Sequence, residues 1–426
     1  MKANHIKLAL ACLLALTAAT GRSDDLDEKA RLGQLCVYDF GAKGDGVTDD
    51  TAAIQAGIDY LARRGGGRLY FPYATNGYLI ASPGREYAAN GRLVRAQLVI
   101  PPGICHNISL VGEMPCKHLY SYQIRLPQNP RFRPTSFGDH GFMNVILHST
   151  WDAPEVHDPK SRPWAVIAAP EGDLAAGCFS VKMFSIFNLE IRAHLNKDKM
   201  YPTTSAANLQ NVARLVIQDS QFCIDDSVGD HLNGKELQEN PCHTAGLIAS
   251  GDQDDIQIFR NVASQGFKYG YVFGEHTTAE HLYVHNTEYA ICFVDSTHPS
   301  IINRVVAQHN QRYFCALPDG TFGRKANLVN LIVNEADYET GFKTRPLVSR
   351  MRYGVWDPEN RFRGSIVYLQ GFPGTGKCYW PIEGGKNICC RALGVTPDDP
   401  DCARRPCEQE QSVLPKSEKD LKVEGD

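Results

Sequence analysis

The stretch VYDFGAKGDGVTDDTAAIQAGID, residues 37–59, places four glycines and five aspartates around a short apolar run. Asp49 or Asp50 is suited to begin a helix, because a carboxylate oxygen accepts hydrogen bonds from the free amides of the first turn. The apolar residues that follow recur at helical spacing, at Ile54, Ile58 and Leu61. We therefore interpret these aspartates as capping and turn residues and not as a catalytic site.

Three glycines at 65–67 end the predicted helix, and LYFP at 69–72 is typical of a short strand. The local order is strand, turn, helix, glycine stop and strand. Together, VYDFGAKGDGVTDDTAAIQAGID and GGGRLYFP resemble the N-terminal segment of pectate-lyase-like right-handed parallel β-helix proteins. In that family the helix covers the end of the coil, which agrees with the capping interpretation.

The resemblance implies an all-β fold, a single-stranded right-handed parallel β-helix of the pectin-lyase-like type with an N-terminal capping helix. We expect the coil over residues 35–347, with loop insertions near 101–171 and 227–245. A C-terminal cap and a cysteine-bearing flexible tail are expected over 348–426. The family includes polysaccharide lyases, glycoside hydrolases, epimerases and phage tailspikes, so the resemblance implies architecture more strongly than reaction.

The charge balance and the first residues bear on partners and location. The chain has 426 residues and a formal net charge of -4 with both signs mixed, so it offers no basic field for nucleic acid. Lys2 and Lys7 precede an apolar run from Leu8 to Ala19, which is typical of a secretory signal over 1–21 and too short to span a bilayer. We expect a secreted or periplasmic protein without a membrane span.

The cysteines predict disulfides more than metal binding. Thirteen of the 14 cysteines lie beyond the signal, an odd number, so at least one is free or pairs between chains. In an exported protein without paired Cys-x-x-Cys spacing, disulfides are favoured over zinc. The sequence therefore predicts no metal site. Five of the cysteines cluster near the end: Cys378, Cys389, Cys390, Cys402 and Cys407.

An internal repeat supports a coil. LVIQDSQFCI from Leu215 aligns without gaps on LYVHNTEYAI from Leu282, and asparagines recur at intervals of 24 after it. A short amide or carboxylate tolerates left-handed backbone and bonds to neighbouring amides, as a stacked turn requires. Chance recurrence is the alternative. The predicted column contains Asp219, Asn261, Asn286, Asn310 and Asn334.

The residue before each member of this column forms a second, mostly polar column that includes Arg260, His285 and His309. If the register holds, His285 and His309 lie one strand spacing apart, ~4.8 Å. We expect this column to face solvent or a groove, where the imidazoles could act as bases and Arg260 could bind an acidic sugar.

A third column is wholly acidic. The turns SGDQ, FGEH, FVDS and LPDG place Asp252, Glu275, Asp295 and Asp319 at intervals of 23, 20 and 24. Turns favour aspartate in any case, so each residue separately is adequately explained as a solvated turn. Four acidic residues in register favour a catalytic site. Carboxylates one and two coils apart would lie ~5 and ~10 Å from one another, and these distances bracket the carboxylate separations that glycosidases use.

Further candidates flank these columns. CIDDSVGDH contributes Asp225 and Asp226, and Asp226 precedes Asp252 by 26 residues, so it could extend the acidic column. Lys268 is a further cation. Trp151 and Trp164 could line sugar subsites, since aromatic faces suit the apolar side of a sugar ring, although core packing explains them at least as well.

Three functions remain open. The leading one is a polysaccharide-degrading glycosidase that draws its acid and its base or nucleophile from Asp226, Asp252, Glu275 and Asp295, with Asp225 beside them. The family's hydrolase signatures are otherwise absent, and no cofactor is expected. The alternative is a lyase acting on a uronic-acid glycan by β-elimination, for which the resemblance implies possible Ca²⁺. The third is a glycan-binding β-helix without catalysis.

Overall fold

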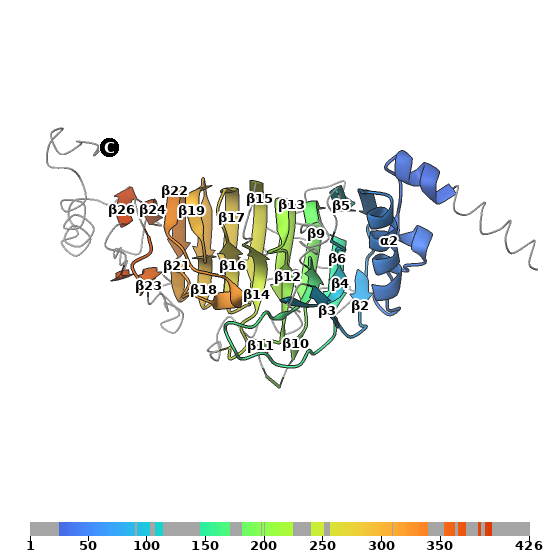
Figure 1. The fold of residues 1–426 in the computed structure, drawn as a ribbon, viewed down its shortest axis with the longest axis horizontal. Coiled ribbons are helices and arrows are strands. Elements are labelled where there is room, and N and C mark those ends of the chain that lie inside the picture. The colour runs from blue at the N-terminus through green and yellow to red at the C-terminus, as the bar shows by residue number, and fades with distance from the viewer. Residues whose placement is uncertain are drawn as a thin grey trace, which may run out of the picture.

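The protein is a right-handed parallel β-helix, a coil whose strands stack in parallel along its length (Figure 1). The computed structural model describes residues 25–89, 92–102, 107–113, 145–170, 181–196, 198–199, 201–224, 240–250, 256–308, 310–339, 353–362, 365–371, 382–384 and 388–393. Each coil visits three faces in a fixed order, which we call the first, second and third faces. The turns between them are the first corner, from first to second face, the second corner, from second to third, and the third corner, from third back to first.

The first face runs the length of the coil. Several of its long strands bend at the first corner and supply the second face as well, which explains their pairing with two sets of partners. Its strands are β1 (Gly67–Phe71), β5 (Asn107–Gly112), β8 (Val181–Phe187), β13 (Val212–Ile224), β15 (Ile256–Gln265), β17 (Thr277–His285), β19 (Ser296–Ile302), β22 (Val329–Glu339), β24 (Ser365–Gly371) and β26 (Ile388–Leu393).

The other two faces complete each coil. The second face adds β2 (Tyr78–Ile80), β6 (Val145–Ser149), β9 (Leu189–Ala193) and β20 (Val305–Gln308) to the bent strands. The third face is a separate sheet of β3 (Arg85–Ala89), β4 (Arg92–Val99), β7 (Trp164–Ala168), β12 (Thr204–Asn208), β14 (Ala245–Ala249), β16 (Tyr269–Phe273), β18 (Tyr289–Phe293), β21 (Arg312–Ala316), β23 (Tyr353–Asp357) and β25 (Ile382–Gly384). A small hairpin, β10 (Leu195–Asn196) and β11 (Tyr201–Pro202), projects from the coil (Figure 1).

Parallel pairing continues past residue 347, where the sequence repeat fades. β23 pairs with β25 and β24 pairs with β26, so the coil reaches Leu393. The coil therefore ends later than the sequence predicts. Parallel strands pair through backbone hydrogen bonds, so the coil can continue where the amino-acid sequence no longer repeats. Within the described residues, no helix combines the length and the apolar character needed to cross a membrane.

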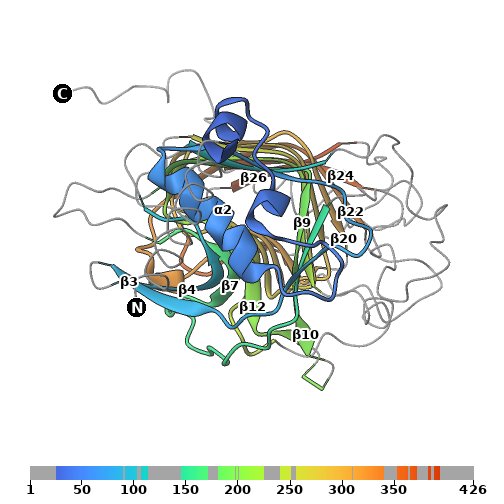
Figure 2. The same cartoon turned by 90° about the vertical axis from the view of Figure 1, so that its right-hand side faces the viewer.

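The helix α2 (Thr51–Arg63) lies across the N-terminal end of the coil, as predicted (Figure 2). The three apolar residues that recur at helical spacing, Ile54, Ile58 and Leu61, are fully buried against this end. The short 3₁₀ helix η1 (Val37–Phe40) precedes it. The helix α2 buries one of its faces against the first coil and so shields the N-terminal edge of that coil from water.

The aspartates of the opening stretch are structural. Asp50 accepts hydrogen bonds from the amides of Lys43 and Gly44, at 2.6 and 3.0 Å. It is the N-cap residue of α2, although its side chain bonds to the preceding turn and not to the helix. Asp49 instead accepts the amide of Thr51 at 3.1 Å and so supplies the capping bond. The interpretation as capping and turn groups is confirmed.

Replacing Asp49 with Asn is expected to destabilise the protein near neutral pH and to matter less in acid. Burial alone would raise the pKa of Asp49, but hydrogen bonds from Ser82, Thr51 and Ala81 outweigh it and lower that pKa to about 2. A carboxyl whose pKa falls on folding contributes stability above its unfolded value, and that contribution is lost as pH falls from about 4 towards about 2. Urea unfolding of both proteins at pH 7 and pH 2.5 measures this. An equal difference at both pH values would contradict it.

The core is a stack of aromatic and aliphatic side chains inside the coil. Phe273 packs against Phe259 and Phe293, with ring centroids 4.8 and 6.0 Å apart, and all three are buried. Tyr271 is also buried, and its hydroxyl lies 2.7 and 2.8 Å from the carbonyls of Val262 and Tyr283, on two adjacent strands of the second face, so it can donate to either. Each coil thus buries its apolar side chains against the coils before and after it.

The stacked asparagine column forms, but in a different register. Asp219 and Asn261 both have left-handed backbone, with φ of 49° and 50°, and Asn261 Nδ2 donates to Asp219 Oδ1 at 2.9 Å. Both lie at the first corner. The next member there is His281, also left-handed, whose Nδ1 lies 3.0 Å from Asn261 Oδ1. The predicted stacking of short polar side chains is therefore confirmed for Asp219 and Asn261, and His281 continues it in the next coil.

Two of the remaining predicted members do not continue it. Asn286 and Asn310 lie at the second corner, where Asn310 Oδ1 accepts the amide of Thr287. Asn334 returns to the first corner and donates to Asn303 Oδ1 at 2.9 Å. The alignment of Leu215 on Leu282 was wrong, because Leu282 pairs with Val262, and Val262 with Ser220. Strands of the first and second faces share one alternating apolar pattern, so sequence similarity alone does not distinguish the faces.

Replacing Asn261 with Ala is expected to cost about 1–3 kcal/mol, the sum of the lost side-chain hydrogen bonds and the strain of left-handed backbone. Asn261→Gly is the matched control, because glycine tolerates φ of 50° and loses only the side-chain contacts to Asp219 and His281. The free energy of unfolding in urea measures both. Equal losses in the two variants would show that backbone strain contributes nothing at this corner.

Candidate functional site

A histidine held by a carboxylate lies at the third corner. Glu275 follows β16, and its Oε2 lies 2.6 Å from Nδ1 of His298 on β19. The Glu275 side chain is 15% exposed, whereas that of His298 is 59% exposed. When Nδ1 donates to the carboxylate, the lone pair is carried by Nε2, and the exposed ring can accept a proton from a bound molecule. Glu275 is the one predicted acid for which the described residues provide such a partner.

An irregularity in β19 positions His298. The register of β19 against β22 shifts between Ser296 and Ser300, so the strand bulges at His298. The two serine hydroxyls lie 2.7 Å apart, and Ser300 Oγ donates to the carbonyl of Gly274, immediately before Glu275. The bulge and the turn are thereby joined, as is common where a strand re-aims a side chain.

His276 completes the cluster. Its ring stacks on that of His298 with centroids 4.5 Å apart and an angle of 12° between planes. Its backbone is left-handed, with φ of 55°, and its carbonyl accepts the amide of Gln257. Donor atoms of Glu275, His276 and His298 all lie within 4.8 Å of one another, so these three residues could also hold a metal ion.

Asp295 occupies the same corner one coil later but is used by the fold. Its Oδ1 accepts the amide and the hydroxyl of Thr297, and its Oδ2 accepts Nδ2 of Asn327 at 2.8 Å. Asp319 similarly accepts the amide of Ala326. The acidic column thus stacks at one corner, since β16, β18 and β21 end on paired residues, but two of its members are bonded as turn groups.

The second corner carries a different group of charges. Lys268 donates to the carbonyl of Asn240 at 3.0 Å and lies 3.8 Å from Glu288, whose other oxygen accepts from Arg312 at 2.9 Å. The Arg312 guanidinium lies over the ring of Tyr289, 4.5 Å from its centroid. These charges compensate one another, which is the arrangement expected for side chains that are mostly buried.

His243 lies at the same corner, beside Tyr269. Its Nδ1 is 2.9 Å from the Tyr269 hydroxyl, and their rings stack. Burial, assisted by the positive charge of Lys268, lowers the pKa of His243 to about 4. The imidazole is therefore neutral at physiological pH, and His285, which is 5% exposed at this corner, is likewise withdrawn from solvent.

Other predicted residues lie elsewhere. Arg260 is on the outer side of the first face in an exposed ion pair with Glu280, so it does not share a corner with Glu275 or Lys268. Trp164 is 8% exposed and packs edge-to-face on Trp151 with centroids 4.9 Å apart, a geometry that favours packing over sugar contact. The predicted side chains that the structure describes therefore occupy different edges of the coil and do not form one line along a single flank.

Four predicted site residues, Asp225, Asp226, Asp252 and His309, lie outside the described residues. Two residues of the third-corner cluster, His276 and His298, were missed by sequence reasoning. His276 directly follows Glu275 in FGEH, which is a usable signal, whereas His298 reaches Glu275 only through the bulge in β19.

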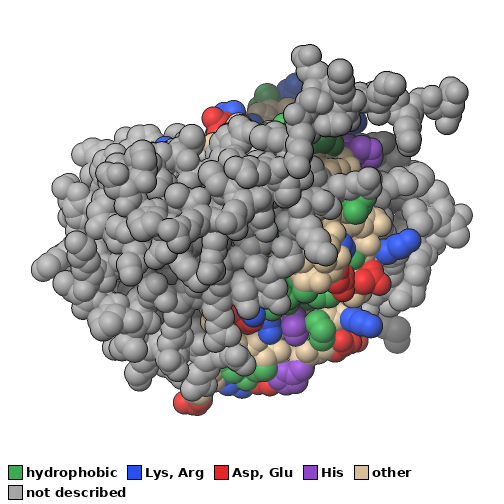
Figure 3. Space-filling view, turned by 90° about the vertical axis from the view of Figure 1, so that its left-hand side faces the viewer, with side chains coloured by type: hydrophobic (Ala, Val, Ile, Leu, Met, Phe, Trp, Pro, Cys, Tyr) green, Lys and Arg blue, Asp and Glu red, His purple; other side chains and the backbone are tan. Residues whose placement is uncertain are grey.

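The end of the coil that carries β26 shows acidic, basic and histidine side chains close together along one side of its described surface (Figure 3).

Among the described residues, each group of three or more possible metal ligands contains one carboxylate. Calcium prefers six to eight oxygen ligands, so neither group is suited to it. The possible Ca²⁺ requirement of a lyase gains no support from this part of the chain.

Residues 35–89 match the family model described as "Rhamnogalacturonase A/epimerase, pectate lyase-like". Alginate lyase 7 of Azotobacter vinelandii is 45% identical over 64 residues, 15% of this chain and 7% of that protein. The mannuronan C5-epimerase AlgE5 of the same organism is 67% identical over 36 residues, 8% of this chain and 4% of its own length. The similarity therefore spans a small part of the curated relatives.

Solved structures with similar folds include Geobacillus virus E2 ORF18, with a TM-score of 0.43 and 14% identity over 90% of this chain and 65% of that one. The A-module of the Azotobacter vinelandii epimerase AlgE6 has a TM-score of 0.32 and 13% identity over 85% of this chain and all of the module. Residues 35–89 thus resemble the pectate-lyase-like superfamily, and the coil of parallel strands closed by α2 has the right-handed parallel β-helix architecture of that superfamily.

Proposed function

We propose that the chain is an exported enzyme that modifies a uronic-acid polysaccharide, with His298 as the base and Glu275 as its positioning residue. The observation that carries this proposal is the 2.6 Å contact between a shielded carboxylate and a largely exposed imidazole. Such a pair fixes the tautomer of the histidine and supports the positive charge that the ring gains on accepting a proton.

The reaction that suits a single oriented base is β-elimination. Nε2 of His298 takes the proton from the carbon next to the uronate carboxylate, the adjacent ring carbon loses its bond to the glycosidic oxygen, and that oxygen leaves with the electron pair and takes a proton from water. A carbon–carbon double bond forms in the sugar. The names of the relatives, an alginate lyase and mannuronan C5-epimerases, are consistent with a uronate polymer as the substrate class.

A glycosidase, the leading function on sequence grounds, needs a second carboxylate free to act beside Glu275. Both oxygens of Asp295 already accept hydrogen bonds within the fold. The described part of the third corner therefore favours proton abstraction over paired-carboxylate hydrolysis.

Incubating the protein with plant, algal and bacterial polysaccharides and identifying the products by mass spectrometry tests the function. The expected result is an unsaturated uronate with new ultraviolet absorbance on one or more acidic glycans. New reducing ends without that absorbance would identify a hydrolase and overturn the proposal. Binding without turnover would favour the glycan-binding alternative.

A further inference from the structure

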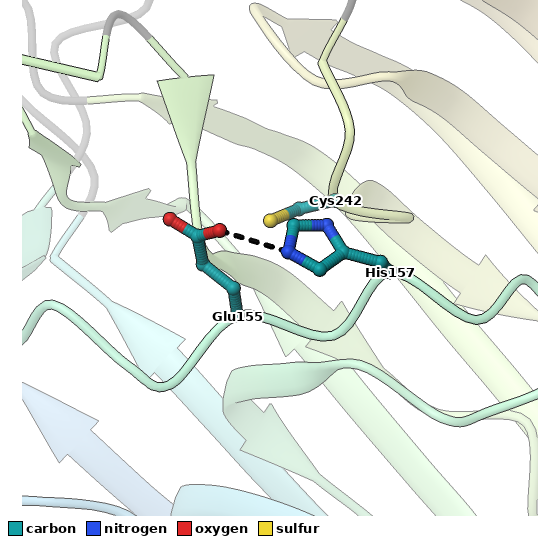
Figure 4. Close-up of side chains that lie close together, drawn as sticks. All are labelled: Glu155, His157 and Cys242. Carbon is teal, nitrogen blue, oxygen red and sulfur yellow. Dashed lines mark ion pairs between the residues drawn. The ribbon is translucent and has the colours of Figure 1, made fainter.

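A second cluster of potential ligands lies at the second corner, away from Glu275 and His298. Glu155 and His157 belong to the segment that precedes β7, and Cys242 directly precedes β14. One donor atom from each of these three residues lies within 4.8 Å of the others. Figure 4 shows the carboxylate, the imidazole and the sulfur converging from two separate segments of the chain.

The cluster combines a buried sulfur with two accessible groups. Cys242 is 1% exposed and is a free thiol, whereas the side chains of His157 and Glu155 are 56% and 28% exposed. Nε2 of His157 lies 2.9 Å from Oε2 of Glu155. The sulfur is thus the buried ligand of the cluster, and solvent reaches the cluster on the side of His157 and Glu155.

The backbone holds the two segments together. One backbone hydrogen bond joins the two segments, from the amide of His243 to the carbonyl of Val156 at 3.4 Å, and within its own segment the amide of Cys242 donates to Asn240 Oδ1 at 2.9 Å. Both contacts are independent of any side chain of the cluster. The three ligands therefore keep their relative positions when one of them is replaced.

One oxygen of Glu155 is already oriented by the protein. Oε1 accepts from the Tyr201 hydroxyl and lies close to Lys199 Nζ, both at 3.1 Å. This leaves Oε2 directed at His157 and Cys242. Lys199 also lies 3.2 Å from Asp152, so its charge has a second partner beside the cluster. A hydrogen-bond partner such as the Tyr201 hydroxyl orients a metal ligand and raises its affinity, whereas the positive charge of Lys199 opposes a bound cation.

We propose that Glu155, His157 and Cys242 bind a single Zn²⁺ ion. Sulfur, imidazole and carboxylate ligands suit zinc, whereas calcium and magnesium prefer oxygen ligands, of which the cluster offers one carboxylate. Tetrahedral zinc separates neighbouring ligand atoms by roughly 3.4 Å, so small side-chain rotations bring the three into place. Three protein ligands leave a fourth position for water or for a group of a bound molecule.

The test uses the full chain, stripped with a chelator and titrated with Zn²⁺ by calorimetry. We expect one zinc per chain, and a loss of affinity of at least ~100-fold in Cys242→Ser and in His157→Gln. With Co²⁺ in place of zinc, the wild type should show a near-ultraviolet thiolate-to-cobalt charge-transfer band that Cys242→Ser lacks. Lys199→Met should bind zinc more tightly, by ~10-fold, because it removes a neighbouring positive charge.

His298→Gln is the matched control, since it removes a histidine from the other possible metal cluster and should leave zinc affinity unchanged. Circular dichroism and thermal unfolding establish that each variant is folded. Less than one zinc bound in the wild type, unchanged affinity in Cys242→Ser, or loss of zinc in His298→Gln alone would each overturn the proposal. None of these readouts depends on the polysaccharide reaction, so the zinc site and the proposed function fail independently.

Discussion

Replacing His298 with Gln is expected to lower kcat/KM on an acidic polysaccharide by about 10²–10⁴-fold, the usual contribution of a general base. Glutamine retains a polar side chain of similar reach but does not accept the proton. The ring of His298 is largely exposed and contributes little to the core, so the variant should unfold at nearly the same urea concentration as the wild type. Product formation followed by ultraviolet absorbance measures the effect.

His281 is the matched control. It is also an exposed corner histidine, on the strand β17 that follows Glu275, and its Nδ1 contacts Asn261 at the first corner. His281→Gln should keep full activity. If instead His281→Gln loses activity and His298→Gln does not, the reacting group lies at the first corner and the proposed site is wrong.

Glu275→Gln separates positioning from binding. The amide cannot support the imidazolium that forms during proton transfer, so kcat should fall by ~10-fold or more while KM changes little. A rise in KM with unchanged kcat would mean that Glu275 contacts the substrate and does not act through His298.

The sequence predicted the N-terminal end of the coil better than the arrangement of side chains along its sides. Asp49, Asp50 and the spacing of Ile54 and Ile58 are local signals, and the structure confirms the capping helix that they indicate. Such signals need no knowledge of distant residues, since capping and helical spacing act within one or two turns.

The register of the coil required long-range information. Leu215 and Leu282 lie in segments with the same alternating pattern, yet the first belongs to the first face and the second to the second face. A self-alignment places them together because both faces bury every second side chain. The histidine and asparagine columns drawn from that alignment were therefore divided between two corners.

The clusters at the second and third corners depend on contacts between residues that are distant in the sequence, so the spacing of residues along the chain does not predict them. His298 reaches Glu275 through a bulge, and Cys242 lies close to His157 although 84 residues separate them in the sequence. Metal-site and catalytic motifs are visible in sequence when their ligands share a turn or a helix. In this coil, equivalent corners are one turn apart in space but 20 or more residues apart in the chain.

Phe273→Ala is expected to destabilise the protein by about 3–5 kcal/mol, the typical cost of removing a buried aromatic ring. Phe273 is fully buried and packs against Phe259, Tyr271 and Phe293, so the cavity would be lined by aromatic rings from two neighbouring strands of the coil and cannot readily collapse. The urea midpoint measures the loss. Ile258→Ala, at an outward position that is 40% exposed, is the control and should change stability by less than ~0.5 kcal/mol.

The same substitution also tests whether the core positions the site. Phe273 is the last residue of β16, and Gly274 and Glu275 follow it directly, with the Gly274 carbonyl bonded to Ser300. Because a coil is stabilised mainly by contacts between neighbouring turns, a cavity here should loosen the third corner before the distant coils unfold. Activity on the polysaccharide should therefore be lost at lower urea concentration than the overall circular dichroism signal. Coincident loss of the two signals would show that the corner and the whole coil unfold together.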